Sequence, residues 1–155
     1  STEFSYFARL PNPKIEMIEI NPLLKELSTL FASEKLDVVL LNVYSGEKIL
    51  GDREQLKIVF VNLFRNSIEA GATKVLITLS QEDNFYNIFV QDNGSGIPKE
   101  YEDKIFNEGF TLKPKGMGIG LATCKKIIEN FGGEISLDKN TSDGVGFKIK
   151  LPKAR

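Results

Sequence analysis

The chain has 155 residues, 41% of them hydrophobic, and its 20 Lys and Arg nearly balance 21 Asp and Glu, for a formal net charge of −1. This length suits one domain, and the near-neutral balance argues against a nucleic-acid partner. One cysteine and no histidine exclude a disulfide framework, imidazole-based zinc sites and Ser-His-Asp triads. No apolar run approaches the roughly 20 residues of a membrane helix and no signal-peptide pattern opens the chain, so we expect no direct membrane contact and a cytoplasmic location.

The first third of the chain combines extended and helical patterns. Residues 15–20 are typical of a short extended segment. Asn21 followed by Pro22 predicts a helix start, with a side-chain cap and then proline at the first helical position, and leucines follow at helical spacing. Residues 38–43 are apolar and β-branched, which predicts a buried strand.

A longer helix and a strand pair follow. Asp52 can cap the helix, with Gln55 in the capping-box position, and Gly71 can end it. The inward stripe of this helix consists of Leu56, Val59, Phe60, Leu63, Ser67 and Ala70. Residues 75–79 and 86–92 are typical of neighbouring strands joined by a polar turn.

The last part of the chain begins with a long stretch rich in glycine and lysine, residues 93–120, in which we expect one short helix at 100–106. A second long helix is predicted over 120–131, followed by strands at 134–137 and 147–151. Two strand pairs have the spacing of hairpins. The sequence therefore predicts an α+β fold, a two-layer α/β sandwich in which a mixed, mainly antiparallel sheet carries its helices on one face.

The helix that begins after Asp52 carries a polar stripe beside its apolar face. Asn62, Asn66 and Glu69 fall on this stripe, and Arg65 lies close to it. An amide oxygen is a neutral, hard ligand, which suits Mg²⁺ already charge-balanced by phosphates. The two asparagines therefore indicate a cleft, although a solvated polar face would give the same pattern.

A glycine-rich turn directly follows the predicted strand at 86–92. It reads Asp92-Asn93-Gly94-Ser95-Gly96-Ile97. The glycines allow turn geometries and a close approach of the backbone to a ligand. Asp92 at the strand end can accept a hydrogen bond from an exocyclic amine, as on adenine. The alternative is a tight turn, because Asp, Asn and Gly dominate turns for local reasons.

A second glycine-rich string opens the helix predicted at 120–131. It reads Lys113-Pro114-Lys115-Gly116-Met117-Gly118-Ile119-Gly120-Leu121. Backbone N–H groups and the helix dipole favour phosphate at a helix start, and the two lysines just upstream could cover it. The string is neither a GxxxxGK[ST] loop nor a dinucleotide fingerprint. The alternative is a flexible helix entry.

Together and in this order, these strings resemble the ATP-binding domain of the gyrase–Hsp90–histidine kinase–MutL superfamily. The resemblance rests on five boxes, at residues 62–70, 92–97, 105–113, 116–122 and 144–147. Within the superfamily, the sequence is similar to the catalytic and ATP-binding domain of bacterial sensor histidine kinases. This resemblance implies a protein-histidine kinase of two-component signal transduction, with the α/β sandwich of that superfamily.

The resemblance also implies ATP and Mg²⁺ as ligands. Asn66 would hold the metal and Asp92 would bind the adenine amino group, while Asn62, Asn66 and Lys113 would be the catalytic residues. The implied contacts to the nucleotide are Asn62, Arg65, Asn66, Asp92, Gly94, Gly96, Ile97, Thr111, Lys113, Gly116, Met117, Gly118, Ile119, Gly120 and Leu121.

Gyrase, Hsp90 and MutL relatives carry a glutamate base at the position of Asn62, whose amide cannot take a proton at neutral pH, and this favours phosphoryl transfer over hydrolysis.

Three departures from the family pattern bear on these expectations. Many members have a basic residue and an aromatic residue at the positions of Glu69 and Ala70, and Arg65 would supply the positive charge here instead. Val145 stands where the last box usually has threonine. The acceptor histidine, which these kinases carry on a helical dimerisation domain, is absent. We therefore expect residues 1–10 to be the end of a dimerisation helix and residues 11–155 to be the ATP-binding domain.

By this resemblance, the domain would pass the γ-phosphoryl group of ATP to a histidine of the dimerisation domain of the same parent protein, for relay to a response regulator receiver domain. Two alternatives stay open. One is a serine protein kinase of the anti-sigma type, which shares these boxes. The other is a nucleotide-binding interaction module without turnover. A gyrase-like ATPase fits less well because of Asn62.

Overall fold

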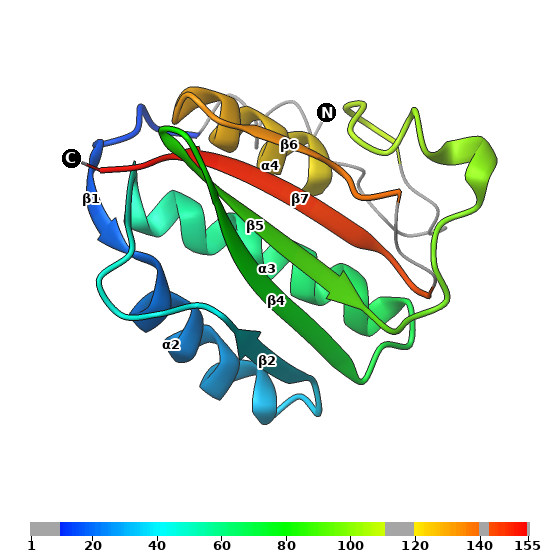
Figure 1. The fold of residues 1–155 in the computed structure, drawn as a ribbon. Coiled ribbons are helices and arrows are strands. Elements are labelled where there is room, and N and C mark those ends of the chain that lie inside the picture. Colours follow the sequence, from blue (N-terminus) through cyan, green and yellow to red (C-terminus); the bar gives the residue numbers. More distant parts are fainter. Residues whose placement is uncertain (1–9, 111–119, 140–142, 155) are drawn as a thin grey trace.

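The computed structural model describes residues 10–110, 120–139 and 143–154, and Figure 1 shows the path of the chain. The helices are α2 (Ile20–Ala32), α3 (Arg53–Glu69) and α4 (Gly120–Asn130), with a short 3₁₀ helix, η1 (Lys99–Tyr101). The strands are β1 (Glu16–Glu19), β2 (Asp37–Leu41), β3 (Lys48–Gly51), β4 (Lys74–Glu82), β5 (Phe85–Asp92), β6 (Glu134–Leu137) and β7 (Gly146–Pro152). Within these described ranges, no helix has the length and apolar character needed to cross a membrane.

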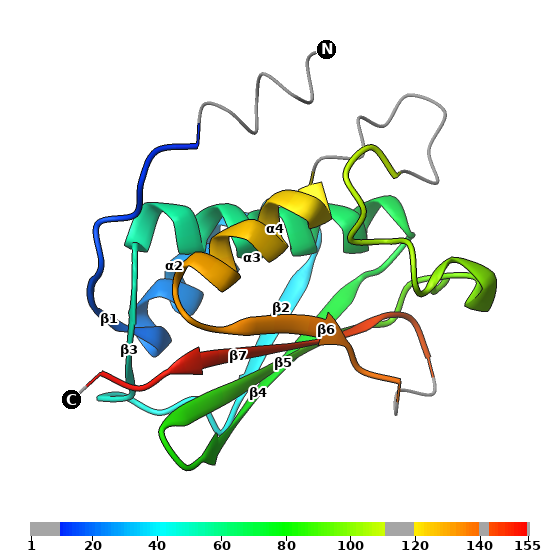
Figure 2. The same ribbon diagram turned by 90° about the horizontal axis from the view of Figure 1, so that it is seen from above.

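Five strands form the main sheet in the order β2-β4-β5-β7-β6, and β1 and β3 form a separate two-stranded sheet. The pair β2–β4 is parallel, whereas β4–β5, β5–β7 and β6–β7 are antiparallel. Figure 2 shows α2, α3 and α4 on one face of the main sheet. The predicted fold class, a two-layer α/β sandwich with a mixed, mainly antiparallel sheet, is therefore confirmed.

The core lies between the helices and the inner face of the main sheet, because alternate strand residues point toward the helices. Ile88 and Ile149 are partners in the register of β5 and β7, and both are fully buried. Phe60 and Phe64 of α3 are also fully buried, and the ring of Phe64 meets that of Phe31 of α2 edge to face, with centroids 5.2 Å apart. Since α3 packs against both α2 and α4, it is the central helix of its layer.

The start of α3 is fixed by side chains that also hold the segment before β1. Oδ1 of Asp52 accepts a hydrogen bond from the N–H of Gln55 at 3.1 Å, which confirms the predicted cap. Oδ2 of the same residue accepts from the N–H of Lys14 at 2.9 Å. The Gln55 side chain donates to the carbonyl oxygen of Pro11 at 2.7 Å rather than back to the capping residue. The capping residues Asp52 and Gln55 therefore also hold the segment that contains Pro11 and Lys14.

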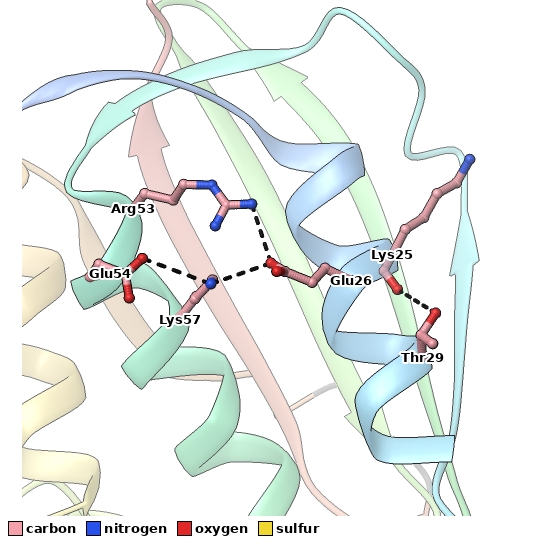
Figure 3. A network of polar contacts seen from close by, with 6 residues as sticks. All are labelled: Lys25, Glu26, Thr29, Arg53, Glu54 and Lys57. Carbon is pink, nitrogen blue, oxygen red and sulfur yellow. Dashed lines mark hydrogen bonds and ion pairs between the residues drawn. The ribbon is translucent and has the colours of Figure 1, made fainter. Parts of the chain in front are cut away.

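An exposed ion-pair network joins α2 to the first turns of α3 (Figure 3). The carboxylate of Glu26 lies 3.2 Å from Arg53 and 3.4 Å from Lys57, and Lys57 lies 3.8 Å from Glu54. The hydrogen bond from Arg53 is the main reason that the pKa of Glu26 is lowered. Because these groups face solvent, the network contributes little to stability, and the buried rings set the position of the two helices.

Two expectations for the first third of the chain were wrong. Helix α2 begins at Ile20, with Glu19 in the cap position and no side-chain cap bond. Asn21, the predicted cap, is instead buried, and its side-chain N–H donates to the carbonyl oxygen of Val43. The amide thus ties α2 to the chain after β2. Strand β3, which pairs with β1, was not predicted at all.

The helix expected at 100–106 is replaced by η1 and a series of turns. The N–H groups of Lys104, Asn107 and Phe110 donate to carbonyl oxygens three residues earlier, as in 3₁₀ geometry. Only Ile105 is buried between residues 100 and 106. A single buried side chain is not enough to form an apolar helical face, so the segment remains a chain of turns.

The thiol of Cys124 offers a test of this packing. It is buried on α4, with its sulfur 3.7 Å from the carbonyl oxygen of Val59, and burial raises the pKa of the thiol from 9.0 to about 12. The unfolded chain ionises near pH 9 while the folded chain does not, so the contribution of the neutral thiol is fully present below pH 9 and is lost as the pH rises toward 12. Between pH 8 and pH 10, we predict that the wild type loses about 1 kcal/mol more unfolding free energy than Cys124→Ala.

Urea denaturation of the two proteins at both pH values measures this difference. The variant is the control, since it shares every other titratable group. An identical pH dependence of the two unfolding free energies would show that the thiol is not buried as described.

Candidate functional site

Asp92, at the end of β5, is a buried carboxylate held by several donors. Oδ1 accepts from the N–H of Gly94 at 3.0 Å and from the N–H of Val145 at 2.9 Å. Oδ2 accepts from the hydroxyl of Ser67 in α3 at 2.7 Å. A carboxylate offers about four acceptor positions, so these bonds leave one position, on Oδ2.

Glycines allow two loops to close around this carboxylate. A Cβ on Gly94 would lie 2.9 Å from the carbonyl oxygen of Ala70, which is closer than side chains tolerate. Gly96 has a φ of +84° and lies against the carbonyl of Gly144. A Cβ on Gly144 itself, at φ +61°, would collide with the backbone and the carboxylate of Asp92. The turn after β5 and the loop before β7 therefore meet at Asp92 only because both contain glycine.

The amides of α3 lie on the side of the helix that faces the start of α4. The side-chain N–H of Asn62 donates to the carbonyl oxygen of Ile58 at 2.8 Å. Its Oδ1 lies at the first residue of α4, because a Cβ on Gly120 would be 3.0 Å from it. Asn66, one turn later, is half-buried, and no described residue bonds its side chain. As far as the described residues are concerned, neither amide oxygen accepts a hydrogen bond.

Gly120 and Leu121 open α4, whose first N–H groups and dipole favour an anion at this end. The first residue is also the one that meets Asn62, so an amide oxygen and a helix N-terminus lie together. Several predicted site residues come just before this helix and lie outside the described residues. They are Thr111, Lys113, Gly116, Met117, Gly118 and Ile119.

The structure does not bring Arg65 to this place. Its guanidinium lies 2.8 Å from the carboxylate of Glu34 and 5.3 Å from the ring centroid of Phe31, on the side of α3 that faces α2. Ile97, another predicted contact, is partly buried against the core beyond the glycine turn. Among the described residues, α3 thus contacts both parts of the candidate site, because Asn62 reaches Gly120 and Ser67 reaches Asp92. Arg65 instead lies beside Glu34.

Two contributors to the site were not assigned a role from the sequence. Ser67 was placed on the inward stripe of its helix, where a lone hydroxyl among apolar residues was the available signal. Val145 has no polar side chain, and it acts through its backbone, with its carbonyl oxygen also accepting from the N–H of Asp92 at 2.9 Å. Only the glycines beside it indicated a close backbone approach.

Chemically, this arrangement is suited to binding rather than to proton transfer. It offers one carboxylate position for an amine, neutral amide oxygens for a hard cation, and a helix N-terminus for an anion. In the described part of the chain, no group of three or more carboxylate or cysteine side chains is placed to hold a metal ion unaided. A nucleotide, with an amine at one end and phosphates at the other, matches these groups.

Comparison with known proteins also indicates a nucleotide-binding domain. Residues 51–155 match the family described as "Histidine kinase-, DNA gyrase B-, and HSP90-like ATPase". The chain belongs to this family. Sporulation kinase A of Bacillus subtilis (strain 168) is 34% identical over 146 residues, which are 89% of this chain and 24% of that protein. The sensor protein FixL of Bradyrhizobium diazoefficiens is 38% identical over 114 residues, which are 70% of this chain and 23% of that protein.

Similarity to solved structures indicates which branch of this family the domain resembles. The nucleotide-free catalytic domain of histidine kinase ThkA superposes with a TM-score of 0.79 and 32% identity, over 90% of this chain and 96% of that chain. The domain is therefore of the same type as the catalytic, ATP-binding domains of sensor histidine kinases. It spans about a quarter of the length of the curated relatives that it matches.

Gly144 tests how closely the two loops meet at Asp92. Gly144→Ala combines a left-handed backbone with a collision against a buried carboxylate, whereas Gly46→Ala has a similar backbone at φ +90° and open space. We predict a loss of about 1 kcal/mol for Gly46→Ala and at least about 1 kcal/mol more for Gly144→Ala. Urea denaturation measures both losses. Equal losses would mean that the loop before β7 does not contact Asp92.

Proposed function

We propose that this domain binds ATP together with Mg²⁺ and donates the γ-phosphoryl group to a histidine of the dimerisation domain of its parent protein. The observation that carries the proposal is the anchored carboxylate of Asp92, which keeps one acceptor position for the adenine amino group. The matched family and the histidine kinase relatives support it. Because ATP is available in the cytoplasm, we propose that the domain works there.

The described residues fit a nucleotide that lies from Asp92 to the start of α4. The first N–H groups of α4 would bind phosphate oxygens beside Asn62. The amide oxygen of Asn66, which no described residue bonds, is a neutral, hard ligand that would hold Mg²⁺. When bound, Mg²⁺ would neutralise charge on the phosphates. Lys113 and the glycines before α4 are proposed to complete the phosphate contacts.

The site favours transfer over hydrolysis. The side chain of Asn62, from α3, reaches the first residue of α4 beside the proposed phosphate site, and an amide does not accept a proton at neutral pH and so does not activate water. Phosphoryl transfer needs mainly positioning and charge stabilisation. The imidazole nitrogen of the acceptor would supply an electron pair for the new P–N bond, and ADP would leave with the pair from the broken P–O bond.

The partners follow from this reaction. The chain contains no histidine, and we propose that another domain supplies the acceptor. We also propose that residues 1–10 are the end of the last helix of that domain and that residues 11–155 form the ATP-binding domain; residues 1–9 lie outside the described residues. Histidine kinase ThkA has been solved in complex with the response regulator protein TrrA, and this chain superposes on that structure with a TM-score of 0.80 over 99% of its length and 46% of that chain. We propose a response regulator receiver domain as the final acceptor here.

Asn66 tests the metal. Asn66→Ala removes the proposed metal ligand without disturbing the core. We therefore predict that ATP affinity in the presence of Mg²⁺ falls at least tenfold, which corresponds to about 1.4 kcal/mol. In EDTA, where no Mg²⁺ is available, we predict little change in affinity. Calorimetric titration measures both. Asn130→Ala, which removes an exposed amide at the far end of α4, is the control. An unchanged affinity in Mg²⁺ would contradict the metal role.

Phosphotransfer in trans tests the reaction itself. We predict that the domain, mixed with a histidine-containing dimerisation domain and γ-³²P-ATP, labels that domain with an acid-labile, base-stable phosphate. Replacing the acceptor histidine with glutamine is the control and abolishes the label. Acid-stable phosphoserine on a protein substrate would favour the serine kinase alternative. ATP binding without any transfer would favour an interaction module, and rapid ATP hydrolysis would favour an ATPase.

A further inference from the structure

We infer that Ser67 is a positioning residue for base recognition: its hydroxyl orients the one Asp92 oxygen that stays open to a ligand and thereby sets the preference for a 6-aminopurine. This inference rests on the proposed binding of ATP. Ser67 is 4% exposed, and it follows Asn66 directly in α3. The same turn of helix therefore carries the proposed metal ligand and the group that reaches the base site.

The hydroxyl of Ser67 has one hydrogen and two acceptors within reach. The carbonyl oxygen of Leu63 lies at 3.1 Å, and Oδ2 of Asp92 lies at 2.7 Å. The carbonyl already accepts a bond within the α-helix, whereas the carboxylate is charged and closer. If the hydrogen pointed to Leu63, two oxygens with lone pairs would face each other at 2.7 Å. The hydrogen is therefore donated to Asp92.

This bond decides what the carboxylate can still do. The N–H groups of Gly94 and Val145 occupy both positions of Oδ1, and Ser67 occupies one position of Oδ2. With the bonds that the described residues make, an amine of a ligand can reach only the second lone-pair position of Oδ2, beside the hydroxyl bond. A 6-oxo group would instead bring an acceptor against an acceptor, which is unfavourable.

No other described side chain can replace this bond. Among the residues that the structure describes, Ser67 is the only one whose side chain donates to Asp92, and the side chain of Val145 is apolar. Without the hydroxyl, both positions of Oδ2 are open and the vacated space admits water. Oδ2 of Asp92 then has no hydrogen bond that fixes the direction of its lone pairs relative to the adenine amino group.

The test compares two nucleotides that differ only in the 6-amino group. Calorimetry with Mg²⁺ gives the Kd of ADP and of purine riboside 5′-diphosphate, and their ratio is the amino-group preference. We expect a preference of at least about fivefold in the wild type, lowered about two- to tenfold by Ser67→Ala, as for the loss of one hydrogen bond. Asp92→Asn, which removes the carboxylate, sets the lower limit of the preference.

Two further variants make the test specific. Ser67→Cys keeps the size of the side chain but donates weakly, and it carries the test if Ser67→Ala does not fold. Thr123→Val is the control, because it removes a buried hydroxyl of α4 that has no hydrogen-bond partner in the described part of the chain. We expect the amino-group preference to fall in Ser67→Cys and to stay unchanged in Thr123→Val.

The outcomes separate this inference from the proposed function. If the wild type binds neither nucleotide, the proposed function fails. If it binds both nucleotides equally, readout of the amino group by Asp92 is wrong and the inference fails with it. If the wild type shows the preference and the folded Ser67 variants weaken both nucleotides by the same factor, Ser67 is only structural. In that last case the inference is overturned while ATP binding stands.

Discussion

The structure depends on keeping one carboxylate, Asp92, buried at the end of β5. A charge is tolerated in an interior only where hydrogen bonds replace its lost hydration. Its donors come from three separate stretches of chain, namely the turn at Gly94, the loop before β7 at Val145, and α3 at Ser67. The site therefore forms only when β5, β7 and α3 are all in place. Folding and the ligand recognition that we propose share one set of contacts, and for this reason we expect a substitution such as Gly144→Ala to affect both.

Helix α3 transmits this constraint to the rest of the domain. Its apolar side brings Phe60 and Phe64 into the core, while another side carries Asn62, which reaches Gly120, and Asn66 one turn later. Because the helical period fixes the angle between these sides, packing of the rings also fixes the direction of the amides. The ion pairs at the start of α3 lie in solvent and add little to this. A loss of core volume beneath α3 would thus change ligand binding without touching a ligand contact.

Sequence patterns predicted what local chemistry decides. The cap at Asp52 was predicted because its partner is three residues away, and the long helices were predicted from their period. Asn21 was given the wrong role, and the partners of Arg65 and Ser67 were not predicted, because the partners of the three residues are 22, 31 and 25 positions away. A polar side chain on a buried stripe indicates that a partner exists without saying which. Strand β3 was missed for a similar reason, since four residues acquire strand geometry only through pairing with β1.

The absence of histidine from the sequence agrees with the chemistry of the described groups. The chain has no imidazole, and the side chain that reaches the first residue of α4 is the amide of Asn62, which is not a base at neutral pH. What remains is a set of groups that bind by hydrogen bonds and partial charges: amide oxygens, N–H groups of a helix start, and one aimed carboxylate. Such groups can hold and orient a nucleotide while giving water little help in attacking it. For the phosphoryl transfer that we propose, this combination would preserve the γ-phosphoryl group for the histidine acceptor.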